Sequence, residues 1–233
     1  MPNLQLRRKR GLSAFRKLSI GTWRTTYDPI VHGSTGLRMD KALAYVDEFR
    51  ERTGKRLTLT HMMAKAVSHV LHEFPDANAV LRFHTIYLRE RVGVMFQVAL
   101  VDPDTNEIDL SASTLFECHE KTLEEIVDEF TATTALVRTR KADSEKSRAL
   151  IQKLPGFVVH PFLRIVTFLQ GTLNLNLSIL GVPSDAFGSV MITNIGSLGL
   201  DEAYPPLVPY SRVPMVLAMG AVTDTPVVED GKV

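Results

Sequence analysis

The stretch GSVMITNIGSLGLDEAYPPLVPYSRVPMVLAMGAV, residues 188–222, decides the fold that we expect for this chain. It opens with a short apolar run that predicts a buried strand. Thr193, Asn194 and Gly196 follow as a turn, because Asn and Gly tolerate positive φ angles. A proline-rich crossing then leads to a second apolar run, residues 213–222, which predicts a second buried strand.

Helical periodicity marks three further stretches. Apolar residues recur at helical spacing in residues 39–53, which Gly54 ends, and in residues 60–74, which Pro75 ends. The strongest helix candidate is residues 122–141, which begin with acidic side chains and close with basic ones. The strand candidates are residues 80–88, 92–101 and 108–111. A turn-rich segment joins the last two and predicts a hairpin. This alternation favours a layered α/β fold over an all-helical one.

Length, charge and cysteine content bound the class of protein. The 233 residues are 45% apolar and 23% charged, which favours one domain, residues 1–233, over two full domains. A net charge of +1 gives no global field to recruit nucleic acid. Cys118 is the single cysteine, and the basic N-terminal arm, residues 1–20, holds no secretory signal. We therefore expect a cytoplasmic protein. For the run Arg7-Arg8-Lys9-Arg10 we expect a solvated basic tail, and contact with phosphate groups or with an acidic partner is the alternative.

An apolar insertion at about residues 155–183 stands out from the rest of the chain. Residues 157–181 are apolar enough to raise the question of a membrane span. Polar residues such as Arg164 and Asn174 interrupt them, and an arginine at the bilayer centre costs about 2.5–3.5 kcal/mol. We expect no transmembrane span, and instead a helical insertion that packs on the body or on a neighbouring subunit. A peripheral membrane face or a partner-binding face is the alternative.

The chain ends close to a turn. Asp230 and Gly231 form the kind of dipeptide that joins two antiparallel strands, and Lys232 and Val233 are the residues that follow it. We therefore expect this polypeptide to lack part of its fold.

Several stretches resemble one enzyme family. Residues 188–196 resemble the G-[ST]-x-x-[IV]-[ST]-N-[IL]-G signature of the catalytic domain of dihydrolipoamide acyltransferases, the core subunits of 2-oxo acid dehydrogenase complexes. Residues 213–222 are similar to the family's P-x-x-A-I-L-A-V-G strand. Residues 57–67, 74–79 and 92–94 are similar to family segments further upstream. The resembling stretches keep the family's order and together cover most of the chain.

The resemblance implies a fold like that of chloramphenicol acetyltransferase, an α/β two-layer sandwich in which a mixed sheet is flanked by helices. It also implies a homotrimer or a larger assembly, with substrate channels between subunits. The implied reaction moves an acyl group between the thiol of a dihydrolipoyl group, carried by a lipoyl-bearing protein, and the thiol of coenzyme A. Both are substrates, so no cofactor is bound permanently.

This reaction needs a base and an oxyanion donor. A thiol attacks a thioester as the thiolate, and the family's base is the histidine of an H-x-x-x-D-G motif that does not occur in these 233 residues. The tetrahedral intermediate needs a hydrogen-bond donor, a role that the resemblance assigns to Thr193. The other two candidates bind substrate or shape the site: Asn194 in the turn, and His32 where the family has a channel-lining strand. The alternative for Thr193 is a structural hydroxyl that bonds local backbone.

The remaining histidines and the cysteine predict no further chemistry. His69 and His72 are three residues apart on a helix, but no pattern of cysteines or carboxylates completes a metal site. Cys118 and His119 are neighbours, and neighbouring side chains on a strand point to opposite faces, which excludes a cysteine hydrolase. Two hypotheses stay open: an acyltransferase represented without its C-terminal part, and a non-catalytic scaffold that kept the fold, lost the base, and uses residues 157–181 as an interface.

Overall fold

The structure is a computed structural model, and it describes residues 2–10, 30–101, 108–139, 156–207, 211–228 and 231. The strands are β1 (Leu6–Arg8), β2 (Ala79–Arg82), β3 (Thr85–Arg89), β4 (Gly93–Val101), β5 (Ile108–Phe116), β6 (Val190–Asn194) and β7 (Met215–Met219). The α-helices are α2 (Asp40–Thr53), α3 (Leu59–Glu73), α4 (Leu123–Arg138) and α6 (Gly156–Thr167). Short helical turns are η1 (Phe168–Thr172), η2 (Ser178–Leu180) and η3 (Gly196–Leu198).

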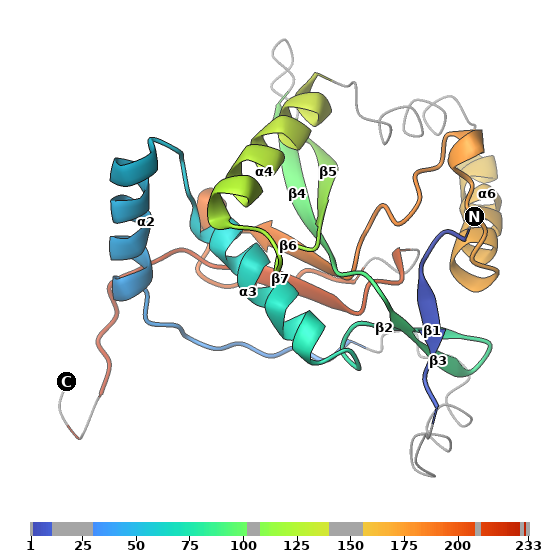
Figure 1. Cartoon of the computed structure of the whole chain (residues 1–233), viewed down its shortest axis with the longest axis horizontal. Helices are drawn as coiled ribbons and strands as arrows, with labels where there is room; N and C mark the ends of the chain where they lie inside the picture. The colour runs from blue at the N-terminus through green and yellow to red at the C-terminus, as the bar shows by residue number, and fades with distance from the viewer. Residues whose placement is uncertain are drawn as a thin grey trace.

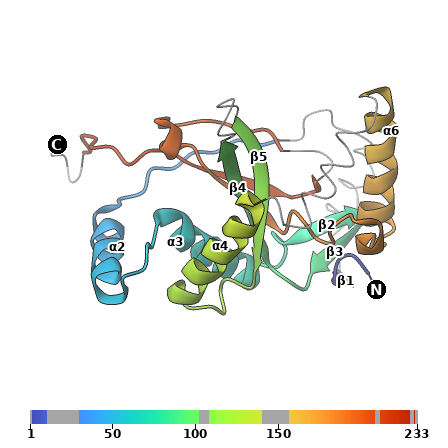
Figure 2. The ribbon, with the colours of Figure 1, turned by 90° about the horizontal axis from the view of Figure 1, so that it is seen from above.

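A mixed sheet forms the centre of the molecule, with the strand order β5-β4-β6-β7 (Figure 1). Strands β4 and β5 pair antiparallel, whereas β6 runs parallel to both β4 and β7. Helices α2, α3 and α4 lie on the same side of this sheet, as Figure 2 shows. The prediction of an α/β sandwich with a mixed sheet and flanking helices is confirmed, and the hairpin between residues 92–101 and 108–111 is present as β4 and β5.

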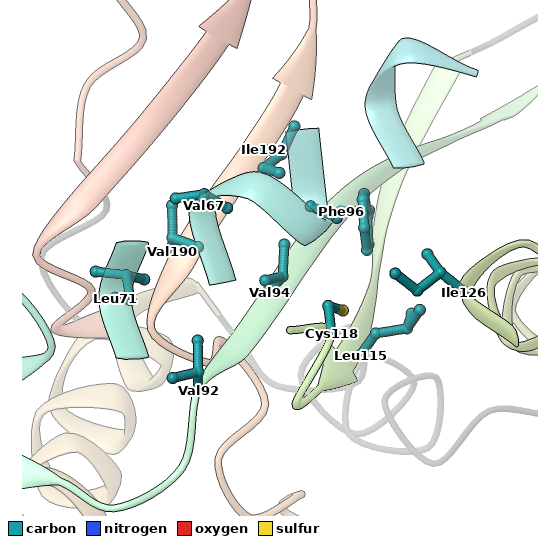
Figure 3. Packing of buried hydrophobic residues seen from close by; sticks show 11 residues of the cluster. Val67, Leu71, Val92, Val94, Phe96, Leu115, Cys118, Ile126, Val190 and Ile192 are labelled. Carbon is teal, nitrogen blue, oxygen red and sulfur yellow. The ribbon is translucent and has the colours of Figure 1, made fainter. Parts of the chain in front are cut away.

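The main core lies between this sheet and helices α3 and α4 (Figure 3). Phe96 of β4 and Ile192 of β6 are each 1% exposed, and they belong to one cluster with Leu71 of α3 and Ile126 of α4. Complete burial of such a side chain contributes about 1.5–3 kcal/mol. This cluster therefore fixes β4 and β6 side by side beneath the two helices.

The helix ends follow their capping residues. Thr122 precedes α4, where its hydroxyl accepts a hydrogen bond from the Glu125 amide at 3.2 Å and the Glu125 carboxylate accepts one from the Thr122 amide at 2.7 Å. Gly54 ends α2 with a φ of 69°, a left-handed conformation that glycine adopts readily. The three predicted helices are confirmed, except that residues 140–141 of the third lie outside the described residues.

Two strand predictions and the prediction for the basic run need correction. Residues 80–88 form the hairpin of β2 and β3 rather than one strand, and Phe83 and His84 make its turn with φ angles of 46° and 57°. Strand β7 is half-buried along its length, because β6 is its single partner in the described sheet. The basic run is not simply a solvated tail: β1 pairs antiparallel with β3, and the Lys9 ammonium contacts the Asp76 carboxylate.

The apolar insertion forms α6, a π-helical turn η1 and the 3₁₀ turn η2, at the opposite end of the molecule from α2 (Figure 1). Within the described residues, no helix has both the length and the apolar character needed to cross a membrane. Of the predicted C-terminal hairpin, Gly231 is described, with a φ of 76°. The rest of that hairpin, residues 229–230 and 232–233, lies outside the described residues.

Candidate functional site

The candidate site stands on the sheet face opposite α3 and α4, which we call the far face. Successive side chains of a strand point to opposite faces, so residues two apart share a face. Phe96 packs towards the helices, whereas Met95 and Met191 form a separate buried cluster. Gln97 and Thr193 each follow one of these methionines by two residues. Both therefore project from the far face.

Thr193 lies where β6 leaves the core. The three residues before it are buried, Thr193 itself is half-buried, and Asn194 is exposed. The Thr193 hydroxyl donates a hydrogen bond to Oε1 of Gln97 at 3.0 Å. Its partner is thus a side chain, which can rotate, and not a main-chain carbonyl. The hydroxyl is therefore less fixed in direction than one that bonds local backbone.

The bond to Gln97 has a chemical consequence. A hydroxyl carries one proton, so Thr193 cannot donate to the Gln97 carbonyl and to an oxyanion at the same time. Rotation of the Gln97 amide by half a turn exchanges Oε1 with Nε2, which then donates to the Thr193 oxygen. In that arrangement the Thr193 proton is free to bind an oxyanion.

Asn194 builds the turn that follows the strand. Its side-chain oxygen accepts a hydrogen bond from the Ser197 amide at 3.2 Å, and its main-chain oxygen accepts one from the Ser197 hydroxyl at 2.7 Å. Its side-chain amide donates to the Thr60 hydroxyl at 3.2 Å, which ties the turn to the first turn of α3. The turn-forming role predicted for Asn194 is confirmed, whereas its role in substrate binding stays a prediction.

Close backbone packing holds this turn in place. A Cβ atom on Gly196 would lie 2.7 Å from the Gly220 carbonyl oxygen and from the Ala221 amide nitrogen, closer than real contacts allow. The Ala221 amide donates to the Leu200 carbonyl at 3.0 Å, so the chain after β7 packs on the chain after η3. Gly196 is therefore required by space, in addition to any preference of the turn.

His32 is exposed and lies against the segment that follows η3. Its ring meets the Tyr204 ring edge-on, with 5.2 Å between the centroids. The Tyr204 hydroxyl contacts the Glu202 carboxylate, and Ser34 bonds to both side chains. The hydrogen bond to Glu202 raises the pKa of Tyr204 and lowers that of Glu202. In the described part of the chain, no hydrogen bond or ring contact joins His32 to the two candidates on β6. The substrate-channel role of His32 stays a prediction.

Cys118 is not suited to be a nucleophile. Its side chain is 0% exposed, and burial raises the pKa of the thiol to about 11, so the thiolate is scarce near neutral pH. The neighbouring His119 turns away from it: its Nδ1 lies 3.1 Å from the Ser68 hydroxyl, and its ring stacks on that of His72 at 4.3 Å. The structure thus agrees with the exclusion of a cysteine hydrolase.

A shallow hollow lies elsewhere, between the end of α2 and the start of α3. It is lined by Arg50, Gly54, Lys55 and Arg56. Two of its cations are already engaged, since Arg50 donates to the Leu57 carbonyl at 3.0 Å and Lys55 contacts two carboxylates of α4. The residues that line the hollow include no hydroxyl, thiol or imidazole group, so the far face remains the better candidate. Among the residues that the structure describes, no cluster of three or more His, Cys, Asp or Glu side chains could hold a metal.

Comparison with known families identifies the chain's class. The model of the family described as 2-oxoacid dehydrogenases acyltransferase (catalytic domain) matches residues 24–149, more than half of the chain. The chain belongs to this acyltransferase family. The match includes His32, α2, α3 and the strands from β2 to β5, and it ends before Thr193. A search of curated proteins found no match.

Solved structures share the fold of this acyltransferase at low sequence identity. The cubic core of a pyruvate dehydrogenase multienzyme complex has a TM-score of 0.59 at 18% identity, covering 94% of this chain and 71% of its own. The dihydrolipoamide acetyltransferase of Azotobacter vinelandii has a TM-score of 0.54 at 19% identity, covering 83% and 63%. A probable dihydrolipoamide acetyltransferase of Listeria monocytogenes has a TM-score of 0.51 at 17% identity, covering 81% and 61%. The chain thus spans less than two thirds of the length of the last two.

Sequence reasoning missed the partners of the three candidates, namely Gln97 for Thr193, Thr60 for Asn194 and Tyr204 for His32. Gln97 carried a signal, because it is the polar residue inside the apolar run GVMFQVALV of β4. Its partnership with Thr193 spans 96 residues of sequence and depends on the parallel pairing of β4 with β6. That pairing could not be read from either strand alone.

Proposed function

We propose that this acyltransferase moves an acyl group between a dihydrolipoyl thiol and the thiol of coenzyme A. Membership of the family supports the reaction class. In the proposal, the Thr193 hydroxyl binds the oxyanion, while Asn194 and His32 contribute to substrate binding. The observation that carries the role of Thr193 is its hydroxyl on the far face, half-buried and bonded to a side chain that can turn.

The chemistry is a thioester exchange. The attacking thiolate sulfur forms a bond to the acyl carbonyl carbon while the carbonyl electron pair moves onto oxygen. The oxyanion then accepts the Thr193 proton in a hydrogen bond, and loss of such a donor typically costs about 2.7–4 kcal/mol. Collapse of the intermediate breaks the bond to the leaving sulfur, which takes up the proton that the base removed. The 2.7–4 kcal/mol corresponds to a rate effect of about 10²–10³.

The structural work on the Azotobacter vinelandii acetyltransferase concerns a serine, a histidine and an asparagine in its catalytic mechanism. We assign the part of that serine hydroxyl to Thr193. We assign the base to no residue of the described chain, since the family's H-x-x-x-D-G motif does not occur in the 233 residues.

The assembly that we propose is a homotrimer or a larger particle in the cytoplasm, working with a lipoyl-bearing protein. The match to a cubic multienzyme core supports an assembled state. Strand β7, half-buried along its length, leaves surface that a neighbouring subunit can cover. Cross-linking followed by sedimentation velocity would measure the number of chains in the particle.

The test supplies the missing base from solution. The purified chain is mixed with S-acetyldihydrolipoamide and coenzyme A, with and without imidazole, and acetyl-coenzyme A is quantified by chromatography above the protein-free reaction. We expect negligible transfer without imidazole and measurable transfer with it. Thr193→Val should lower the imidazole-dependent rate by about 10²–10³, whereas Thr193→Ser keeps the hydroxyl and most of the rate.

The control variant is Thr139→Val, which removes an exposed threonine at the end of α4 and should leave the rate unchanged. Equal rates for Thr193→Val and the unmodified chain would show that Thr193 is not the donor. Robust transfer without imidazole would show that the chain contains its own base. Failure of the unmodified chain to transfer even with imidazole would favour the non-catalytic scaffold.

A further inference from the structure

The insertion that contains α6 leaves its apolar side chains uncovered. From residue 161 to residue 179 no residue is buried. The most exposed apolar side chains are Ile165 at 60%, Phe168 at 50%, Leu175 at 46% and Ile179 at 96%. Exposed apolar side chains concentrated in one short segment, here residues 165–179, mark a site where a chain can meet another phase or another molecule.

The insertion is nevertheless anchored to the body at its C-terminal end. Asn174 exchanges two hydrogen bonds with the backbone of Leu4, at 2.7 and 2.8 Å, and Leu175 pairs with Pro2. The Gln170 side chain donates to the Pro183 carbonyl at 3.2 Å. The uncovered side chains are therefore held in a defined position and are not a loose tail.

Two guanidinium groups meet at this anchor. Arg82 donates to the Thr172 carbonyl at 2.8 Å, and Arg212 donates to the Thr172 hydroxyl at 2.7 Å. Burial and then the charge of Arg82 lower the pKa of Arg212, which shows that the two cations are close enough to repel. Among the residues that the structure describes, neither arginine has a carboxylate partner.

The insertion also carries positive charge and contains no acidic residue. Residues 156–184 contain no Asp or Glu, and Arg164 is exposed on α6. Arg8 is also exposed, and strand alternation places it on the same face of the β1-β3-β2 sheet as Arg82. The next carboxylate in the chain, Asp185, is bound to the buried Arg89.

We propose that this face, made of residues 161–179 with Arg8, Arg82 and Arg212, docks on the surface of a bilayer that contains anionic phospholipids. The apolar side chains enter the boundary between headgroups and acyl chains, while the guanidinium groups bind lipid phosphates. Helix α6 and η1 together extend about 25 Å at 1.5 Å per residue, which suits a segment lying in the plane of the interface.

The charge pattern favours a bilayer over a second copy of the chain. Two copies that meet through this same face, about a twofold axis, would bring its arginines towards their counterparts. No carboxylate of residues 156–184 lies between them, and like charges oppose such a contact. An anionic membrane surface can bury the apolar side chains and bind the cations at the same time. This proposal is independent of the acyl-transfer reaction.

Vesicle co-sedimentation tests the proposal. The whole chain is mixed with vesicles of phosphatidylcholine alone or of phosphatidylcholine with one third phosphatidylserine, and the bound fraction is measured. We expect at least tenfold tighter binding to the anionic vesicles. The double variant Ile165→Glu with Phe168→Glu should weaken that binding at least tenfold, and Leu136→Glu on the exposed surface of α4 should leave it unchanged.

A second pair of variants tests the charges. Arg8→Gln with Arg164→Gln should lower anionic binding about tenfold, whereas Lys41→Gln with Arg138→Gln, which neutralises two exposed cations elsewhere, should not. Equal binding of the unmodified chain to both vesicle types, or none to either, would overturn the proposal. A different result would also overturn it: sedimentation velocity shows a dimer of the unmodified chain, the Ile165→Glu with Phe168→Glu variant is monomeric, and neither vesicle type binds the chain.

A local probe guards against variants that fail to fold. The chain's single cysteine, Cys118, is 0% exposed, so a thiol-reactive environment-sensitive dye will label Ile179→Cys selectively. We expect its emission to shift to the blue with anionic vesicles, and the same dye on Leu136→Cys to keep its aqueous spectrum. An unshifted spectrum at position 179, with the fold intact by circular dichroism, would contradict docking through this face.

Discussion

The hydroxyl of Thr193 and the side-chain amide of Gln97 lie 3.0 Å apart on neighbouring parallel strands. The paired residues of β4 and β6 end at Phe96 and Ile192, so this contact continues the ladder by one position through side chains. It lies on the face of the sheet away from the helices. A catalytic hydroxyl whose proton is held by a neighbouring amide depends on which end of that amide faces it.

Gln97→Glu should abolish the contribution of the Thr193 hydroxyl to the transfer rate. A carboxylate is an acceptor alone at neutral pH, so it holds the Thr193 proton and also places a negative charge beside the oxyanion. We expect the imidazole-dependent transfer rate to fall by about 10²–10³. Gln97→Met keeps the length of the side chain without either effect, and should cost tenfold or less. Equal transfer rates for the Glu and Met variants would show that the Gln97 side chain does not affect oxyanion binding.

His61 makes stability depend on pH. The residue is 4% exposed, its Nδ1 accepts a hydrogen bond from the Thr58 amide at 3.2 Å, and burial lowers the pKa of the imidazole to about 4. The unfolded chain has a pKa near 6.5 at this residue, so it takes up the proton first as the pH falls. The stabilisation is complete above pH 6.5 and is lost progressively down to pH 4, by about 3 kcal/mol in total.

His61→Gln tests this dependence, because glutamine suits the third position of a capping box and does not titrate. Urea unfolding at pH 7, 5.5 and 4.5 should show a difference in unfolding free energy between the variant and the unmodified chain. From pH 7 to pH 4.5 this difference should change by about 2.4 kcal/mol in the variant's favour. His69→Gln, exposed on the same helix, serves as the control and should track the unmodified chain. A constant offset for His61→Gln at all three pH values would exclude burial of a neutral imidazole.

The sequence predicted the helices and the central strands well, because their apolar periodicity is local. The hairpin at Phe83 and His84 escaped prediction, since neither is a residue that usually adopts positive φ, and the turn is imposed by the pairing of Arg82 with Thr85. The edge position of β7 and the contact of Gln97 with a strand 96 residues away depend on strand order, which local patterns do not encode. Thr193 was chosen as a candidate through its motif, whereas its hydrogen-bond partner Gln97 was not predicted.

Cys118 should be chemically silent in the folded protein. With a side chain 0% exposed and a pKa raised to about 11 by burial, the thiol should react with a chromogenic disulfide only as fast as the fold opens. Full reaction is expected in guanidinium chloride. Cys118→Ala should keep the imidazole-dependent transfer rate and lose about 1 kcal/mol of stability. Rapid titration of the native thiol, or loss of transfer in Cys118→Ala, would reinstate the cysteine as a candidate nucleophile.

Gly188 sets the start of the parallel ladder on which the site depends. Its φ is 61°, and a Cβ atom there would lie 2.6 Å from the Gly93 carbonyl oxygen, the same oxygen that accepts from the Ser189 amide at 2.7 Å. Gly188→Ala must therefore strain its backbone and part β4 from β6. We expect about 2–4 kcal/mol of lost stability in urea unfolding, from the left-handed backbone and the lost contact.

The same variant should affect the site, because Gln97 and Thr193 lie further along the same two strands. Under conditions where Gly188→Ala remains folded, its transfer rate should fall at least tenfold. Gly33→Ala is the matched control: a Cβ atom there meets nothing within 4 Å, and its stability and rate should stay within about 0.5 kcal/mol and twofold. If Gly188→Ala were as stable and active as Gly33→Ala, the close approach of β4 and β6 could not be what positions Thr193.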